Sequence, residues 1–173
     1  MAVSPARRGP SVATRLRLAR ATEEGTATGI YGVIVSLAVM AASSAGSALA
    51  IDVAVLITLA IYWGAERYAR VLAERIHTGH RPTWRDLRRQ LTGGWEMVAA
   101  SAVPLAVLSL ARLLGASVAG AVTWALAAGT VLLCLSGWEA GRYGQLSGRE
   151  RVVSTVVAGT FGVALAVLKA LLH

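Results

Sequence analysis

The chain has 173 residues, of which 55% are hydrophobic and 15% are charged, and its mean hydropathy is positive. Few soluble globular proteins of this length have such a composition, which is typical of integral membrane proteins. The net charge of +8 comes mainly from arginines between the apolar runs, without zinc-finger or RNA-motif spacing. This distribution argues against a nucleic-acid partner and favours contact with a lipid bilayer that has anionic headgroups.

Residues 1–21 combine Pro5 and Pro10 with small residues and arginines, and they have no sustained apolar face. We predict that they form a disordered basic cytoplasmic tail. The remaining residues, 22–173, contain five apolar runs, each near the roughly 17 to 25 residues that a helix needs to cross a membrane. The runs are 28–46, 49–65, 97–116, 118–138 and 152–172. The sequence therefore predicts an all-α fold, an integral membrane bundle of five transmembrane helices.

Arginine is unevenly distributed over the segments that join these runs. Five arginines precede the first run, seven follow the second and three separate the fourth from the fifth. The turn after the first run holds none, and only Arg112 lies near the turn between the third and fourth runs. Segments rich in arginine remain on the cytoplasmic side of a membrane. We therefore expect a multi-pass protein of the inner (cytoplasmic) membrane, with its N-terminus inside and its C-terminus outside.

A basic segment joins the second and third runs. We expect the second helix to continue beyond the membrane to residue 76, because residues 77–82 include a glycine and a proline that end a helix. A short amphipathic helix then follows along the inner membrane surface, and a solvated connector is the alternative. The predicted headgroup contacts are Trp84, Arg85, Arg88 and Arg89.

Small residues recur every four positions in two of the runs. Such stripes let helix backbones approach closely in a membrane, where association gains little from hydrophobic burial. We predict that they mark contacts between helices, either within one chain or between the subunits of a homo-oligomer. The stripes are Ala121, Ala125 and Gly129 in the fourth run and Ser154, Ala158, Gly162 and Ala166 in the fifth.

Three carboxylates fall at the cytoplasmic ends of the predicted helices. Glu66, Glu96 and Glu139 each lie close in sequence to a tryptophan, a residue that marks the membrane interface. If their helices meet, these side chains form an acidic ring that can bind a cation or exchange protons. Tyr62 and Asp52 lie on nearly the same face of the second helix as Glu66 and complete the candidate ion or proton site.

A structural role for these carboxylates is the alternative. Glu66 can pair with Arg70, Glu139 can pair with Arg142 or Tyr143, and each carboxylate can also extend to the lipid headgroups. A transporter predicts that the glutamates converge on a solvated cavity, whereas a scaffold predicts separate ion pairs. A lipid-modifying enzyme predicts two carboxylates beside an apolar pocket.

The sequence has few signs of enzyme chemistry. It contains no Gly-x-Ser-x-Gly turn and no phosphate-binding loop, and two aspartates are too few for the Asp-rich motifs of membrane prenyltransferases. His77 and His80 are two potential metal ligands without a nearby cysteine or acidic cluster, so a metal is undecided and no cofactor is predicted. The favoured function is transport of a small cation or proton, and the alternative is a non-catalytic structural or partner-binding membrane protein.

Two short segments, Ile61–Ala69 and Leu168–His173, resemble a family of small five-span integral membrane proteins of actinobacteria that has no assigned activity. This resemblance implies a protein of the bacterial inner membrane. The topology is also similar to that of the vacuolar iron transporter family, which has five spans and a second helix that projects into the cytoplasm. That family has an acidic metal-binding connector, whereas this connector is basic, so the resemblance implies a topology rather than iron transport.

Overall fold

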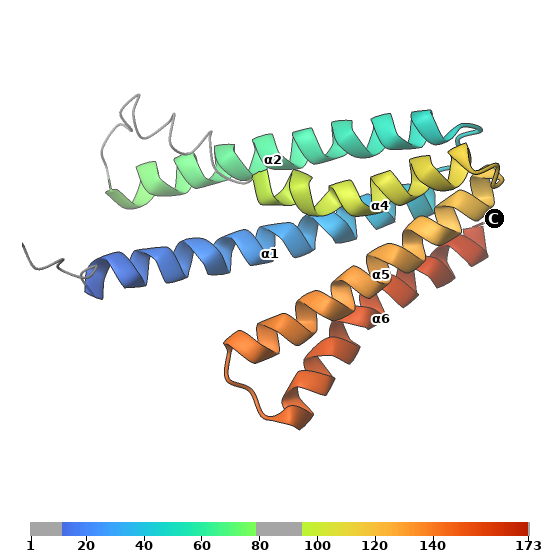
Figure 1. Cartoon of the computed structure of the whole chain (residues 1–173). Coiled ribbons are helices and arrows are strands. Elements are labelled where there is room, and N and C mark those ends of the chain that lie inside the picture. Colours follow the sequence, from blue (N-terminus) through green and yellow to red (C-terminus); the bar gives the residue numbers. More distant parts are fainter. Residues whose placement is uncertain (1–11, 79–94, 173) are drawn as a thin grey trace, which may run out of the picture.

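The structure, a computed structural model, describes residues 12–78 and 95–172. These ranges form five helices and no strand, and the helices are α1 (Val12–Ala42), α2 (Ala48–Thr78), α4 (Trp95–Leu113), α5 (Val118–Tyr143) and α6 (Gly148–Leu172) (Figure 1). Each helix contains a segment of at least 18 residues that is long and apolar enough to cross a membrane. The prediction of a helical fold with five helices suited to cross a membrane is therefore confirmed for the described residues.

Helix α1 begins earlier than the sequence predicted. It starts at Val12, so residues 12–21, which we expected in a disordered tail, are helical. The reason is local, because no glycine or proline lies between Pro10 and Gly25 and the segment is rich in alanine, leucine, arginine and glutamate, which favour helix. Residues 1–11 lie outside the described residues.

Helix α2 extends to Thr78, past the end of its apolar segment at Ala73. The sequence predicted this extension, with an end near residue 76 and thus close to the observed one. The amphipathic helix predicted after it, with the headgroup contacts Trp84, Arg85, Arg88 and Arg89, lies outside the described residues, as does His80.

Helix α4 ends at Leu113, before the end at residue 116 that hydropathy predicted. Gly115 has a positive φ of 89°, and its N–H donates to the carbonyl of Arg112 while the N–H of Ala116 donates to the carbonyl of Ala111. This pair of hydrogen bonds is the Schellman motif, which stops a helix where a residue adopts the left-handed conformation. The apolar run therefore continues through a turn rather than through helix.

The helices meet at one end of the bundle and separate at the other (Figure 1). We call the end that holds the α1–α2 turn, the α4–α5 turn and the end of α6 the C-terminal end, and the opposite end the N-terminal end. The α5–α6 hairpin diverges from α1 toward its own turn at the N-terminal end (Figure 1). The most extensive helix contacts are those of α5 with α6 and of α1 with α4. The bundle is thus two helix pairs that open into a wedge, with α2 beside α1 and α4.

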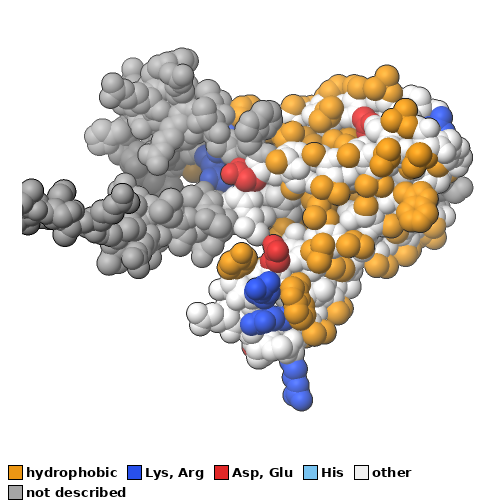
Figure 2. Space-filling view, in the orientation of Figure 1, with side chains coloured by type: hydrophobic (Ala, Val, Ile, Leu, Met, Phe, Trp, Pro, Cys, Tyr) orange, Lys and Arg blue, Asp and Glu red, His pale blue; other side chains and the backbone are white. Residues whose placement is uncertain are grey.

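The buried core lies where the helices come together. Fully or nearly fully buried apolar side chains come from four helices, whereas α6 supplies none of them. The outward face of α6 is instead covered by exposed valines and Phe161, as a helix in contact with lipid requires. Apolar side chains also cover much of the surface seen in Figure 2. The largest core residues are Leu37 and Met40 of α1, Ile51, Val55 and Leu59 of α2, Leu108 of α4, and Val122 and Leu133 of α5.

Several residues of the predicted small-residue stripes lie at close contacts between helices of one chain. A Cβ atom added at Gly137 of α5 would lie 2.8 Å from the carbonyl oxygen of Ser154 and 3.0 Å from the Cβ of Ala158, both on α6. At Gly162 of α6 an added Cβ would collide with Thr130 of α5, and at Gly129 it would collide with Leu37 of α1. Ala166, the last residue of the α6 stripe, is exposed, so the stripes are used for contacts within the chain only in part, and a homo-oligomer stays a prediction.

Candidate functional site

Glu66 forms an ion pair with Arg70 one helical turn further along α2. Its Oε1 atom accepts hydrogen bonds from Nη2 of Arg70 at 2.6 Å and from Nε of Arg70 at 3.2 Å. Both side chains are partly exposed, so this pair contributes only a few tenths of a kcal/mol, about the value of an i,i+4 pair on a helix surface. The pairing is the one that the structural alternative predicted for Glu66.

A cavity of about 230 Å³ lies beside this ion pair, and we call it the α1–α2 cavity. Glu66 and Tyr62 of α2 both line it, so the structure brings these two predicted site residues together. Its other walls are Thr28, Tyr31 and Val35 of α1 and Met97 of α4.

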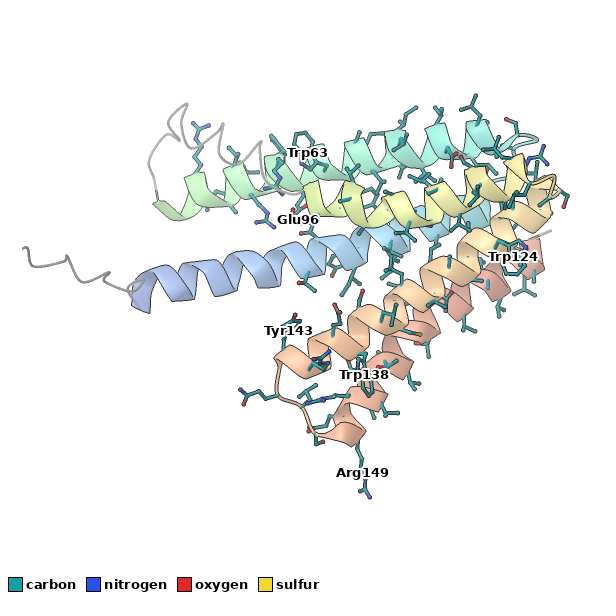
Figure 3. The ribbon with its side chains drawn as sticks, viewed as in Figure 1. Trp63, Glu96, Trp124, Trp138, Tyr143 and Arg149 are labelled. Atoms are coloured by element: carbon teal, nitrogen blue, oxygen red, sulfur yellow. The ribbon has the colours of Figure 1, made fainter. Side chains whose placement is uncertain are left out.

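Glu96 lines a different and larger space. This space, which we call the α1–α4–α5 groove, has a volume of about 660 Å³. Glu96 stands in the first turn of α4, close to α1 (Figure 3). The Cγ of Glu96 lies 3.4 Å from the position that a Cβ of Gly25 would occupy. The groove is lined by Gly25, Thr26, Gly29, Ile30 and Val33 of α1, Glu96, Ala99, Ala100 and Val103 of α4, and Leu132 and Ser136 of α5.

The carboxylate of Glu96 has no partner in the described part of the chain. It makes neither an ion pair nor a hydrogen bond with another described residue, in contrast to Glu66. Its surroundings in the groove are mostly apolar, and the hydroxyl of Ser136 on the opposite wall donates to the carbonyl of Leu132 at 2.9 Å. Glu96 is exposed, and its place in the lining of the groove allows it to attract a positive charge to this wall of the bundle.

The groove exists because small residues on α1 and α4 meet while α5 diverges. A Cβ added at Gly32 would collide with Met97, and one added at Gly29 would touch the Cβ of Ala100 at 3.5 Å. Helices α1 and α4 thus pack closely and form the floor of the groove. The α5 helix is held toward α6 at this end, because an added Cβ at Gly141 would lie 2.8 Å from the Cγ of Arg151. The divergence leaves the far wall at a distance from the floor.

Glu139 does not join the other two glutamates. It is exposed on α5, lines neither the groove nor the α1–α2 cavity, and forms no ion pair with Arg142 and no hydrogen bond with Tyr143. Its chain neighbour Trp138 lies on the diverging hairpin, away from Glu96 (Figure 3). Among the residues whose side chains the structure describes, there is no group of three His, Cys, Asp or Glu that could hold a metal ion. The described cavities do not bring Glu139 together with Glu66 or Glu96, because α5 follows α6 and diverges from α1 at this end of the bundle.

Asp52 lies toward the C-terminal end, far along α2 from Glu66. Its Oδ2 atom accepts a hydrogen bond of 2.6 Å from the hydroxyl of Ser109 on α4, and its Oδ1 atom is buried without a partner in the described chain. Between the two carboxylates, the hydroxyl of Thr58 donates to the carbonyl of Ala54 within α2. Asp52 lines neither the groove nor the α1–α2 cavity, so no described space joins it to Glu66.

Arg67 is a functional candidate that the sequence interpretation missed. We expected it among the cytoplasmic arginines, but its side chain is only 8% exposed, and its Nε atom is buried without a partner in the described chain. A signal was present, since Ile51, Val55, Leu59 and Arg67 fall on one stripe of α2 with a spacing of four or eight residues. That periodicity places Arg67 on the buried face of the helix.

Comparisons with protein-family models, with curated proteins and with solved structures found no match to this chain. The description of the candidate site therefore rests on the positions of its residues in this structure. The site consists of a large apolar groove with one unpaired carboxylate, a smaller cavity beside an ion pair, and a hydrogen-bonded aspartate near the opposite end of the bundle.

Proposed function

We propose that the protein lies in the inner (cytoplasmic) membrane and transports a small cation or a proton, with its N-terminus inside and its C-terminus outside. The charge distribution supports this orientation. Arg75 near the end of α2 and the arginines beside the α5–α6 turn lie at the N-terminal end, whereas Arg112 and Lys169 lie toward the C-terminal end (Figure 1). The end richer in arginine is expected on the cytoplasmic side.

Cation binding is supported by one observation. The carboxylate of Glu96 lies on the wall of the α1–α4–α5 groove and has no partner among the described residues. A carboxylate beside an apolar groove at the membrane boundary is stabilised by a positive charge nearby. The groove lies at the N-terminal end of the bundle, so a cation enters it from the cytoplasm in the proposed orientation. One carboxylate, rather than a ring of three, is the proposed first binding group.

Asp52 is the proposed second group, nearer the outer end. A buried Oδ1 atom without a hydrogen-bond partner is costly when the carboxylate is charged. A cation bound there would supply the missing partner of this oxygen atom, so we assign Asp52 to cation binding at the outer end. The two groups lie on different helices, and a pathway between them requires a rearrangement of the packed core that contains Val55 and Leu59.

A structural or partner-binding membrane protein is the second candidate. The Glu66–Arg70 ion pair favours it, because separate pairing of the carboxylates is what a scaffold predicts. A lipid-modifying enzyme is supported less well, since it requires two carboxylates beside one apolar pocket and the described lining of the groove holds one.

The experiment that separates these functions is ion and proton flux in liposomes that contain the purified protein. We expect flux with the wild type and a loss of most of it with Glu96→Gln, which removes the charge but keeps the shape. Glu139→Gln is the matched control, because it removes an exposed carboxylate outside the groove. Absence of flux above empty liposomes, with the protein folded, would move the assignment to the structural or partner-binding role.

A further inference from the structure

We propose that the α1–α4–α5 groove binds an amphiphilic organic cation, a molecule with one ammonium-type charge and an apolar tail, and that Glu96 is its counter-charge. This inference rests on one part of the proposed function, the binding of a cation by Glu96, and it replaces the small cation by an organic one as the ligand of this groove. Three features of the groove support this inference. They are the size of the groove, the small number of side-chain ligands for a metal ion in its lining, and the position of Glu96 at its edge.

The groove has the size of a site for an organic molecule. Its volume of about 660 Å³ falls within the roughly 300 to 1,000 Å³ of small-molecule sites in proteins. A water molecule takes about 30 Å³ in the liquid, so a bare monovalent ion with a few waters fills only part of this space. A proton needs no cavity of this size.

The described lining offers few side-chain oxygen atoms for a bare metal ion. Calcium takes about six to eight oxygen ligands and magnesium takes six in a strict geometry. The described lining offers one carboxylate and the hydroxyls of Thr26 and Ser136, and the remaining residues are glycine or apolar. An organic ammonium group needs less, because a single carboxylate can balance its charge while the apolar walls hold the rest of the molecule.

Glu96 stands at the boundary between the groove and the outer surface of α4. Besides the groove, it lines a second, shallower hollow together with Val98, Ala99 and Ala102. The cationic head can therefore reach Glu96 from the membrane interface while the tail lies along Val33, Val103 and Leu132. Long cationic side chains divide in the same way, with an apolar stem and a charged head.

The side chain of Glu96 lies against Gly25 of α1. A Cβ atom there would lie 3.4 to 3.6 Å from three atoms of the Glu96 side chain, so glycine leaves the carboxylate room to adjust to a ligand. The groove contains no aromatic side chain in its described lining, so recognition depends on charge pairing and apolar contact rather than on a cage of rings.

The test measures binding of radiolabelled dodecyltrimethylammonium to the full-length protein in phosphatidylcholine nanodiscs, after subtraction of binding to empty nanodiscs. Neutral dodecanol is the matched probe without charge. We expect saturable binding of one cation per chain to the wild type. Glu96→Gln should weaken cation binding about tenfold or more, the usual loss for one charge-assisted interaction, and leave dodecanol binding unchanged.

Two further variants locate the site. Ala99→Trp fills the groove from an exposed position on α4 and should weaken binding of both probes, whereas Glu139→Gln should change neither. The proposal is overturned if the cation binds no better than to empty nanodiscs, or if Glu96→Gln binds it as well as the wild type. It is also overturned if a second copy occupies the groove, in which case Ala99→Trp converts a dimer to a monomer and probe binding is absent.

The binding test and the flux experiment can reject the inference and the proposed function separately. Flux of a small cation that depends on Glu96, without binding of the amphiphile, retains the proposed function and rejects this inference. Binding of the amphiphile without any flux retains the inference and assigns the groove to ligand recognition rather than to transport.

Discussion

The hydroxyl of Ser154 on α6 donates a hydrogen bond of 3.1 Å to the carbonyl of Gly137 on α5. This contact is possible because Gly137 has no side chain and the two backbones approach closely. It joins the two helices of the hairpin at the point where α5 leaves α1. The shape of the groove therefore depends on packing between α5 and α6 as much as on the residues that line it.

Gly137→Ala should destabilise the hairpin. The new Cβ would lie 2.8 Å from the backbone oxygen of Ser154, which cannot move without shifting α6, so we expect a loss of about 1 to 3 kcal/mol. Gly64→Ala is the matched control, because nothing lies within 4 Å of its added Cβ and alanine favours helix by about 0.5 to 1 kcal/mol. Denaturant unfolding in detergent measures both. Equal effects of the two substitutions would contradict the close α5–α6 packing.

Gln145→Gly should stabilise the protein. Gln145 has a positive φ of 53°, and the N–H groups of Gln145 and Leu146 donate to the carbonyls of Arg142 and Gly141, as in the Schellman motif that ends α4. Glycine adopts this conformation without strain, so we expect a gain of up to about 1 kcal/mol in the free energy of unfolding.

Gly115→Ala is the reciprocal substitution, with an expected loss of similar size. Its φ is 89° and nothing lies within 4 Å of its added Cβ, so only the backbone conformation is tested. Thermal unfolding of the two single variants beside the wild type gives the comparison. A stabilising Gly115→Ala would contradict the turn geometry described here.

Asp52→Asn should be tolerated far better than Asp52→Ala. Asparagine keeps an oxygen that accepts the hydrogen bond from Ser109 and carries no charge, so we expect little loss or a small gain of stability. Alanine leaves the hydroxyl of Ser109 without this partner and should cost about 1 to 3 kcal/mol. Unfolding midpoints of both variants check the prediction, and a larger loss with asparagine would show that the negative charge itself is required.

Arg67→Met should not destabilise the protein. Nε of Arg67 is buried and has no hydrogen-bond partner in the described chain, so an apolar side chain of similar length removes an unfavourable buried polar atom. Arg142→Met, at an exposed position on α5, serves as the control and should change stability by less than about 0.5 kcal/mol. A marked loss for Arg67→Met alone would reveal a partner for the guanidinium.

Most of the fold could be predicted from hydropathy and the positions of glycine and proline. Five apolar runs correspond to the five described helices, and the small-residue stripes with Gly129 and Gly162 do mark close helix contacts. The sequence did not predict that α1 begins at Val12, because a polar segment rich in arginine and glutamate has no apolar periodicity that would indicate a helix. The C-terminal end of α4 depends on the turn at Gly115, which hydropathy cannot detect.

The candidate site could be predicted only in part. The spacing on α2 brought Tyr62 and Glu66 to one cavity, as expected for residues four apart on a helix. The sequence could not show which helices lie next to one another, because glutamates at the same depth in a membrane can belong to helices that are not neighbours. Glu139 is therefore apart from Glu96, and the buried Arg67 was counted with the exposed arginines.

The most direct test of a cation site at Glu96 is carbodiimide labelling of the carboxyl groups of the protein in nanodiscs, followed by peptide mass spectrometry. If Glu96 is an unpaired carboxylate in an apolar groove, it should be labelled more readily than Glu66, which is paired with Arg70. Prior addition of dodecyltrimethylammonium should protect it, and the label at exposed Glu139 should not change. Labelling of Glu66 in preference to Glu96, or no protection of Glu96 by any cation, would contradict the assignment of the groove as a cation site.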